Sequence, residues 1–355
     1  MELIAILRDP ALTSRLDGAG WARVLGQARR ANLLGALAVR SVVAGIAVPP
    51  AVARHLDGAS QVAERQRLSV SWEAHQLQRV LGPLGVPVLL LKGAAYVMCA
   101  PDLALGRTFG DIDILVPEAS LGEVENSLLL AGWVNAKSDP YDQRYYRQWM
   151  HELPPLKHLR RGTVLDVHHR LLPRTARHAS DPTPLFARAR PIAGLAALSV
   201  PAPEDLLAHS LTHLMHEGEL HNGLRDLHDV DEMARRFGAD PAFWSRFTEA
   251  VAPGGLAHPV GLGLHLAASV LGTPLPGDLV PRLLGGPPPP WLVPVYRRGL
   301  GLETSGQVLA DLLIYIRAHA LRMPWSLLIG HLTVKAWHRL RPEPARPGVA
   351  PLPER

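Results

Sequence analysis

Cysteine is nearly absent from this chain, and long apolar runs are missing. The single cysteine, Cys99, excludes an internal disulfide and favours a reducing compartment such as the cytoplasm. The longest apolar stretches are far shorter than the roughly 18–20 residues that span a bilayer. Residues 1–8 carry charges at Glu2 and Arg8 and have no apolar core, unlike a signal peptide. We therefore expect a cytoplasmic protein without a membrane span.

Lysine is also scarce, and it occurs only at Lys92, Lys137, Lys157 and Lys335. The net charge of +5 would suit a nucleic-acid partner. However, the arginines are scattered, without a dense basic block and with little aromatic interleaving, so we regard nucleic acid as the least favoured partner. The scarcity of lysine draws attention to Lys92, because a compact ammonium suits a point contact to phosphate.

Apolar periodicity divides the chain into three parts and a tail. Apolar residues make up 47% of the 355 residues, which is enough for one large domain or two ordinary ones. We expect an N-terminal helical region over 1–82, a mixed α/β core over 83–200 and a C-terminal helical region over 201–340. The proline-rich tail, 341–355, is expected to be disordered.

Within these parts the predicted elements follow from spacing and from breaker residues. Helices are predicted at 21–37, 59–81, 121–131, 204–217, 224–237, 260–271 and 305–322, and strands at 86–91, 112–116 and 163–168. Pro49 and Pro50 separate the first two helices, and residues 285–290 form a stiff Gly-Pro loop. Residues 173–200 are rich in proline and arginine and are expected to form a connection.

Two carboxylates occupy alternate positions of the second predicted strand. Because side chains alternate between the faces of a strand, Asp111 and Asp113 share one face, and Ile112 and Ile114 point into the core. Like charges side by side repel each other unless a cation neutralises them. Carboxylate oxygens suit magnesium, so the pattern predicts a magnesium site. An ordinary strand with one solvated face is the alternative interpretation.

The third predicted strand carries Asp166 and His168 on one face, by the same alternation. A pair of carboxylates with a third on a neighbouring strand is what a two-metal phosphoryl-transfer site requires. Asp111 and Asp113 would bind both ions. Asp166 would bind the metal on the nucleophile side and help to deprotonate the acceptor. We include His168 among the nucleotide-binding residues.

A Lys-Gly turn ends the first predicted strand, and a helix of small residues is expected to follow. The Gly93 N–H and the Lys92 ammonium would hold the β- and γ-phosphates of a nucleoside triphosphate, because N–H groups at the start of a helix attract anions. Arg107 would neutralise the charge that builds up in the transition state.

Taken in order, these segments resemble the uncharacterised nucleotidyltransferase family related to DNA polymerase β. The family pattern is an LKG turn, an R…DIDLLV strand and an LDLHW strand, matched here by Lys92-Gly93, Arg107, residues 111–116 and Asp166-Val167-His168. The resemblance covers residues 83–235 and implies the nucleotidyltransferase fold, a short mixed sheet with flanking helices. It also implies transfer of a nucleoside monophosphate from a triphosphate with magnesium. We expect two Mg²⁺ ions and ATP as the triphosphate.

The chain departs from the family pattern at His169, where the family has tryptophan. In addition, Lys-Gly replaces the Gly-Ser turn of the wider superfamily, so Lys92 must serve in place of the serine at the γ-phosphate. Residues 224–227 match a later LR…DL helix of the family, which implies a supporting role near the site for Asp226. Family members resemble accessory enzymes of biosynthetic clusters, and a small molecule, a peptide or a protein would be the acceptor.

Several alternatives remain open at the level of sequence. His209, His213 and His216 share one helix face with a spacing that can bind zinc, although we favour a polar face packed near the active cleft. The basic, amphipathic residues 325–340 suit a membrane surface or a partner, but we favour a packed terminal helix. For the whole protein, the alternative to an enzyme is a catalytically degenerate nucleotide-binding or scaffold protein of the same fold.

Overall fold

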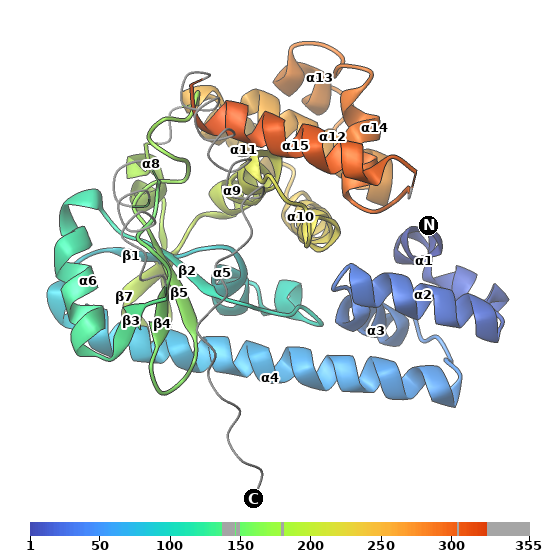
Figure 1. Cartoon of the computed structure of the whole chain (residues 1–355), viewed down its shortest axis with the longest axis horizontal. Helices are drawn as coiled ribbons and strands as arrows, with labels where there is room; N and C mark the ends of the chain where they lie inside the picture. The colour runs from blue at the N-terminus through green and yellow to red at the C-terminus, as the bar shows by residue number, and fades with distance from the viewer. Residues whose placement is uncertain (137–145, 147–149, 179–180, 304, 325–355) are drawn as a thin grey trace, which may run out of the picture.

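In the part of the chain that the structure describes, seven strands form one mixed sheet that helices cover (Figure 1). The computed structural model describes residues 1–324 except 137–145, 147–149, 179–180 and 304. The strand order is β3-β4-β5-β2-β1-β7-β6. The strands are β1 (Val88–Leu90), β2 (Ile112–Leu115), β3 (Trp133–Asn135), β4 (Leu156–His158), β5 (Val164–His168), β6 (Arg190–Ile192) and β7 (Leu195–Val200). The predicted mixed α/β fold with a short mixed sheet and helical flanks is confirmed.

The three strands predicted from the sequence are neighbours in the middle of this sheet. β2 and β5 run parallel, with Asp113 opposite Asp166 and Leu115 opposite His168. β1 pairs antiparallel with β2 and parallel with β7. Because residues opposite each other in register point to the same face, the carboxylates of Asp113 and Asp166 lie side by side.

The helices before the sheet are α1 (Glu2–Arg8), α2 (Gly18–Arg30), α3 (Leu34–Val43) and α4 (Pro50–Leu81). The predicted helix over 21–37 is in fact two helices, because Asn32 adopts a left-handed conformation with φ of 56° between them, and asparagine tolerates that conformation. Helix α4 starts at Pro50, where the missing N–H costs nothing. It continues for 32 residues and contacts α5, α6 and β7 along one side of the sheet (Figure 1).

The remaining helices follow or interrupt the strands. They are α5 (Lys92–Cys99), α6 (Leu121–Leu130), α8 (Thr183–Ala187), α9 (Pro203–His216), α10 (Gly223–Phe237), α11 (Phe243–Val251), α12 (Ala257–Leu271), α13 (Leu279–Leu284), α14 (Leu292–Gly299) and α15 (Gln307–Arg322). The predicted helices at 121–131, 204–217, 224–237, 260–271 and 305–322 correspond to α6, α9, α10, α12 and α15. The short helices α11, α13 and α14 were not predicted.

The prediction for residues 173–200 was wrong. This stretch contains α8 and the hairpin β6–β7, and β7 pairs with β1 inside the sheet. Composition misled the prediction, because the prolines and arginines mask the buried positions Leu195, Leu198 and Val200. Pro191 lies on the edge strand β6, where a missing N–H is tolerated.

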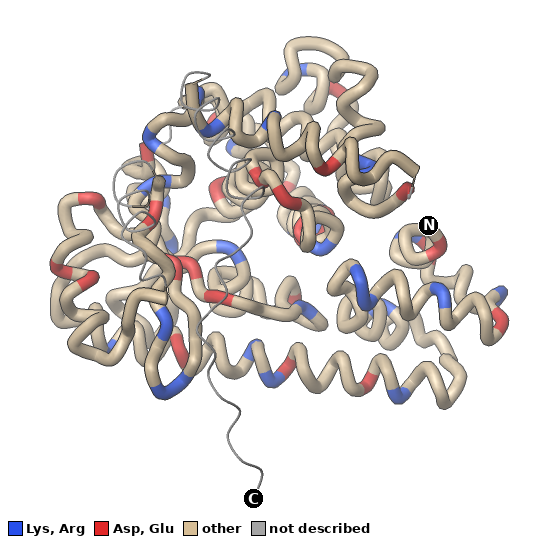
Figure 2. Tube along the Cα trace, viewed as in Figure 1, with Lys and Arg blue, Asp and Glu red and all other residues tan. Residues whose placement is uncertain are grey.

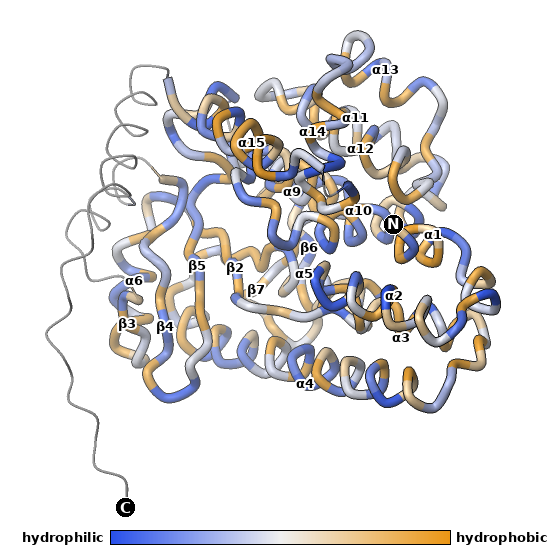
Figure 3. The backbone as a smooth tube through the Cα atoms, turned by 45° about the vertical axis from the view of Figure 1, so that its right-hand side comes forward, coloured by the Kyte–Doolittle hydropathy of each residue, from blue (hydrophilic) through white to orange (hydrophobic). Residues whose placement is uncertain are grey.

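The two faces of the sheet differ in polarity. Ile112, Ile114 and Val116 point into the main core, which also includes residues of the N- and C-terminal helices. On the other face of β2, Leu115 belongs to a small apolar cluster with Leu89, Leu91 and Leu185, and Asp111 and Asp113 precede it. In Figure 3 the most hydrophobic segments lie along the strands and the inner sides of the helices. The second face is therefore apolar only at one end and polar where the candidate site lies.

Within the described residues, no helix is long and apolar enough to cross a membrane. The predicted loop over 285–290 is confirmed, since it joins α13 to α14 without regular structure. The predicted terminal helix, 325–340, and the predicted disordered tail, 341–355, lie outside the described residues.

Candidate active site

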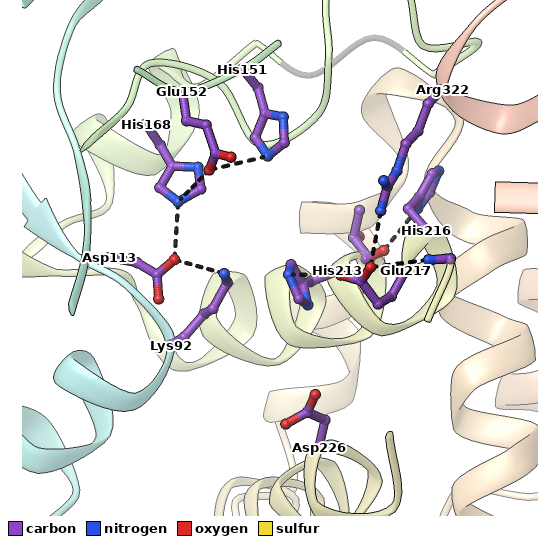
Figure 4. Close-up of polar contacts among 12 residues, drawn as sticks. Lys92, Asp113, His151, Glu152, His168, His213, His216, Glu217, Asp226 and Arg322 are labelled. Carbon is purple, nitrogen blue, oxygen red and sulfur yellow. Dashed lines mark hydrogen bonds and ion pairs between the residues drawn. The ribbon is translucent and has the colours of Figure 1, made fainter. Parts of the chain in front are cut away.

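A cavity of about 450 Å³ is lined by residues of the sheet and of the C-terminal helices. The sheet side contributes Lys92, Gly93, Asp111, Asp113, Glu152, Asp166 and His168. The facing side, which we call the helical wall, consists of His213, His216, Glu217, Arg225, Asp226 and Arg322. Figure 4 shows the two groups facing each other across the cavity. Every residue that the sequence placed in the site lines this cavity.

The three predicted carboxylates come from adjacent strands. Asp111 directly precedes β2 and is exposed, whereas Asp113 lies inside β2 and is only 4% exposed. Asp166 is opposite Asp113 in register. Strand alternation predicted only which face of its own strand each side chain occupies. The structure brings the three side chains together on one wall of the cavity.

Two basic side chains contact Asp113. The Lys92 ammonium donates to Asp113 Oδ1 at 2.7 Å, and His168 Nε2 lies 3.0 Å from the same oxygen (Figure 4). Burial opposes the charge on Asp113, but Lys92 and His168 outweigh it and hold the pKa of Asp113 well below its usual range. Burial likewise opposes the charge on Lys92, yet Asp113 raises the pKa of Lys92 above its ordinary value, so the ammonium stays protonated.

Asp166 has no such compensation. Its Oδ1 is buried and makes no hydrogen bond with any residue that the structure describes. Burial and then the neighbouring charges of Glu152 and Asp113 raise the pKa of Asp166 to about 7. A buried carboxylate oxygen without a partner, beside two further carboxylates, is the environment that a divalent cation relieves. The residues present therefore fit the magnesium that the sequence predicted.

The Lys-Gly turn has an unusual backbone and tight surroundings. Lys92 adopts φ of 43°, a left-handed conformation that few non-glycine residues take up. A β-carbon built on Gly93 would lie 2.6 Å from Arg107 Nη1 and 2.8 Å from Phe109 Cδ1. Only glycine fits there without displacing these side chains. The start of α5, which carries Lys92 beside Asp113, can therefore lie close against Arg107 and Phe109.

Arg107 lines the cavity but is held by an acidic partner from α10. Its Nε donates to Asp229 Oδ2 at 2.8 Å, and its guanidinium lies over the rings of Tyr96 and Phe109. Only 10% of the Arg107 side chain is exposed. The predicted cation is therefore present at the cavity, and it also joins the core to the C-terminal helices.

The helical wall carries its own ion pairs. Arg225 donates to Asp226 Oδ1 at 2.8 Å. Glu217 lies 3.6 Å from both Arg322 and His213 (Figure 4). Figure 2 shows Lys and Arg interspersed with Asp and Glu over the described residues, and the helical wall has the same mixed character.

The predicted histidine face of α9 is partly in the cavity. His213 and His216 line it, whereas His209 is buried beneath. Among the described residues these histidines do not form a group that could hold a metal ion. His169, which replaces the tryptophan of the family, is buried, with Nδ1 3.7 Å from Glu118.

Sequence reasoning missed His151 and Glu152. They belong to no predicted element, yet their segment lies along the end of β5, with a bridge between Glu152 and His168. Glu152 Oε2 lies 3.4 Å from His168 Nε2. Their only signal was the adjacent His-Glu pair itself, because no periodicity marks an irregular segment.

A mixed sheet that presents paired carboxylates to a cavity beside a Lys-Gly turn is the arrangement expected of a nucleotidyltransferase. The family model described as uncharacterised nucleotidyltransferase matches residues 17–272, and the chain belongs to this family. The match extends beyond residues 83–235, where the motifs lie, into the helices on both sides. Membership makes the protein a nucleotidyltransferase, an enzyme that transfers a nucleoside monophosphate.

Two solved structures are similar to the chain. One is the antibiotic-resistance factor ANT(2'')-Ia, with 15% identity over 52% of this chain and 96% of that chain and a TM-score of 0.33. The other is an antigenic nucleotidyltransferase-like protein from Paracoccidioides brasiliensis, with 16% identity over 61% of this chain and 96% of that chain and a TM-score of 0.28. No curated protein matches the chain.

Proposed function

We propose that the protein transfers a nucleoside monophosphate from a nucleoside triphosphate, ATP in the first instance, to an acceptor hydroxyl or phosphate by a two-metal mechanism. The observation that carries the proposal is the set of three carboxylates on one cavity wall beside Lys92. Residues 83–200 would form the catalytic core, and the helices of 201–340 would shape the acceptor side.

Asp111, Asp113 and Asp166 would hold two Mg²⁺ ions. Bound magnesium supplies charge neutralisation for the attacking and leaving oxygens of a phosphoryl transfer. Asp113, buried and ionised, would hold the ions together with Asp111. Asp166 Oδ1, which has no hydrogen-bond partner in the described part of the chain, would accept the proton of the acceptor hydroxyl or bind the ion beside it.

The triphosphate would lie between the Lys-Gly turn and the helical wall. Lys92 is free to donate to a phosphate oxygen once another cation neutralises Asp113, and the Gly93 N–H at the start of α5 would add a second donor. Arg107 would stabilise negative charge that develops on the transferred group. His168 and Asp226, both at the cavity surface, would orient the nucleotide.

The space between the two walls of the cavity would limit which acceptors can reach the carboxylates. A small molecule, a peptide or a protein side chain would reach the carboxylates through the same cavity. We propose that the enzyme acts as an accessory enzyme of a biosynthetic cluster, in the cytoplasm. Exchange of the C-terminal helices with those of a family member of different acceptor preference tests whether these helices select the acceptor.

Calorimetry of each nucleoside triphosphate with Mg²⁺ tests the proposal directly. We expect the wild type to bind one triphosphate in a magnesium-dependent manner and the double variant Asp111→Asn/Asp113→Asn to lose that binding. Asp278→Asn, which changes an exposed carboxylate far from the carboxylate wall, serves as the matched control. Wild-type protein that binds no triphosphate and releases no pyrophosphate with a broad acceptor panel would contradict the proposal.

A catalytically degenerate nucleotide-binding protein is the second candidate. The observation in its favour is that the Lys92 ammonium is bound to Asp113, a predicted metal ligand, while His169 departs from the family pattern. Tight nucleotide binding that is unaffected by Asp111→Asn would support this candidate instead, because binding would then not depend on the metal ligands.

A further inference from the structure

His151, Glu152 and His168 form a compact group of metal-type ligands at the sheet side of the cavity, which we call the His-Glu-His group. One ligand atom from each residue lies within 4.8 Å of the other two. Glu152 Oε2 is 3.4 Å from His168 Nε2 and 4.0 Å from His151 Nε2 (Figure 4). Ligands of a tetrahedral zinc ion at about 2.0 Å stand roughly 3.3 Å apart. The three side chains thus need to move little to share one ion.

The backbone holds these ligands in place. The His169 N–H donates to the His151 carbonyl at 2.9 Å, and the Leu153 N–H donates to the Val167 carbonyl at 2.9 Å. Together with the bridge between Glu152 and His168, these bonds pair the segment antiparallel to the end of β5. A site whose ligands are fixed by backbone pairing loses little entropy when it binds an ion.

The chemistry of the group differs from that of the three aspartates. Two imidazoles and one carboxylate suit zinc, nickel or another nitrogen-binding divalent ion, whereas magnesium prefers oxygen ligands alone. The rings of His151 and His168 lie close together, with centroids 5.2 Å apart. Among the residues that the structure describes, His151 Nδ1 is buried without a hydrogen-bond partner.

We propose that the His-Glu-His group is a site for a nitrogen-binding divalent cation such as zinc, distinct from the magnesium ligands and directly beside them. His168 Nε2 lies 3.0 Å from Asp113 Oδ1, and an ion bound to this nitrogen would replace that hydrogen bond and lie next to the carboxylate wall. The site would tie the segment around His151 to the strands that carry the aspartates. It goes beyond nucleotidyl transfer, because neither His151 nor Glu152 is among the residues proposed to hold the triphosphate or the magnesium ions.

The test is metal binding by the full-length protein with Zn²⁺ alone, followed by Co²⁺ as a spectroscopic probe. Metal-stripped protein is dialysed against Zn²⁺ and the bound metal is measured by mass spectrometry. Visible absorption of Co²⁺ then reports whether nitrogen ligands surround the ion. We expect one Zn²⁺ per chain and a Co²⁺ spectrum of low coordination number.

Variants locate the ion. His151→Ala and the isosteric Glu152→Gln remove a ligand each, and we expect affinity for Zn²⁺ to fall by more than the roughly 10–100-fold that follows loss of an outer-shell partner. His213→Ala removes a histidine from the opposite wall of the same cavity and serves as the matched control. Circular dichroism of each variant confirms that the fold is kept.

The outcomes separate this inference from the proposed function. Asp111→Asn should abolish magnesium-dependent nucleotide binding and leave Zn²⁺ binding unchanged. Wild-type protein that takes up no Zn²⁺, or uptake that survives both His151→Ala and Glu152→Gln, would overturn the cation site, whatever the nucleotide experiments show.

Discussion

At the scale of single residues, Gly93 shows how a missing side chain arranges the site. A β-carbon there would meet Arg107 Nη1 and Phe109 Cδ1 at less than van der Waals distance. Arg107 has little room to retreat, since Asp229 and the rings of Tyr96 and Phe109 hold it. The glycine therefore sets how closely the Lys-Gly turn approaches Arg107, and both line the proposed triphosphate site.

We expect Gly93→Ala to destabilise the protein by about 1–3 kcal/mol, the usual cost of overpacking, and to weaken nucleotide binding. In an open helical position the same change would instead stabilise by about 0.5–1 kcal/mol. Gly110→Ala is the matched control, because Gly110 lines the same cavity and a β-carbon there meets no atom within 4 Å. Equal effects of the two substitutions in chemical denaturation would refute this account of Gly93.

At the scale of elements, helix α9 combines burial with ionisable side chains. Nearly all its residues are buried, including His209 and His216. Burial lowers the pKa of His209 to about 3 and that of His216 to about 4, from an ordinary value of 6.5. Both rings are therefore neutral in the folded protein at neutral pH. They regain the pKa of an ordinary histidine only when the protein unfolds.

This makes α9 a source of acid sensitivity. Below the unfolded-state pKa of 6.5, the unfolded chain binds protons that the folded chain excludes, so the free energy of unfolding falls as pH drops from about 6.5 to about 4 for His216. His216→Asn removes the titrating ring, and the amide is positioned to replace the Nδ1 hydrogen bond to the Thr212 carbonyl. We expect the variant to lose less stability over this range, by up to about 3 kcal/mol at about 1.4 kcal/mol per pKa unit.

Urea denaturation of wild type and His216→Asn at a series of pH values measures the difference. Comparison with the variant is needed because Asp113, with its lowered pKa, also loses its stabilising charge in acid. Parallel pH profiles for the two proteins would show that His216 does not contribute.

At the scale of the whole molecule, the buried pair of Arg107 and Asp229 joins the segment before β2 to the C-terminal helices. The two side chains are 10% and 8% exposed, and 122 positions separate them in sequence. Burial raises the pKa of Asp229 in spite of Arg107, which reflects the cost of placing a charge there. Such a pair adds little net stability while intact but is costly to break.

We expect Asp229→Ala to destabilise the protein by about 3–5 kcal/mol, because Arg107 is left as an uncompensated buried charge. The exposed pair of Arg236 and Asp102 joins α10 to the segment just before Arg107, with side chains 42% and 72% exposed. Asp102→Ala should therefore change stability by no more than about 1 kcal/mol. Similar losses of melting temperature in both variants would contradict the assignment of the buried pair as the main link.

What the sequence determined by itself was local. Alternation along a strand placed Asp111 with Asp113, and Asp166 with His168, because the side-chain period of a strand is a property of the backbone. The central strands and the longer helices followed from the same periodicities. The order of these motifs along the chain was also enough to suggest the family to which the chain belongs.

What only the tertiary structure decided was which of these local patterns meet. The pairing of β2 with β5 brought Asp166 beside Asp113, and the return of α10 placed Asp229 on Arg107. His151 and Glu152 reached His168 through backbone pairing of an irregular segment, and β7 entered the sheet from a stretch whose prolines and arginines favoured a loop. Such contacts depend on packing between segments distant in sequence. No local periodicity encodes that packing, so these contacts could be identified only in the tertiary structure.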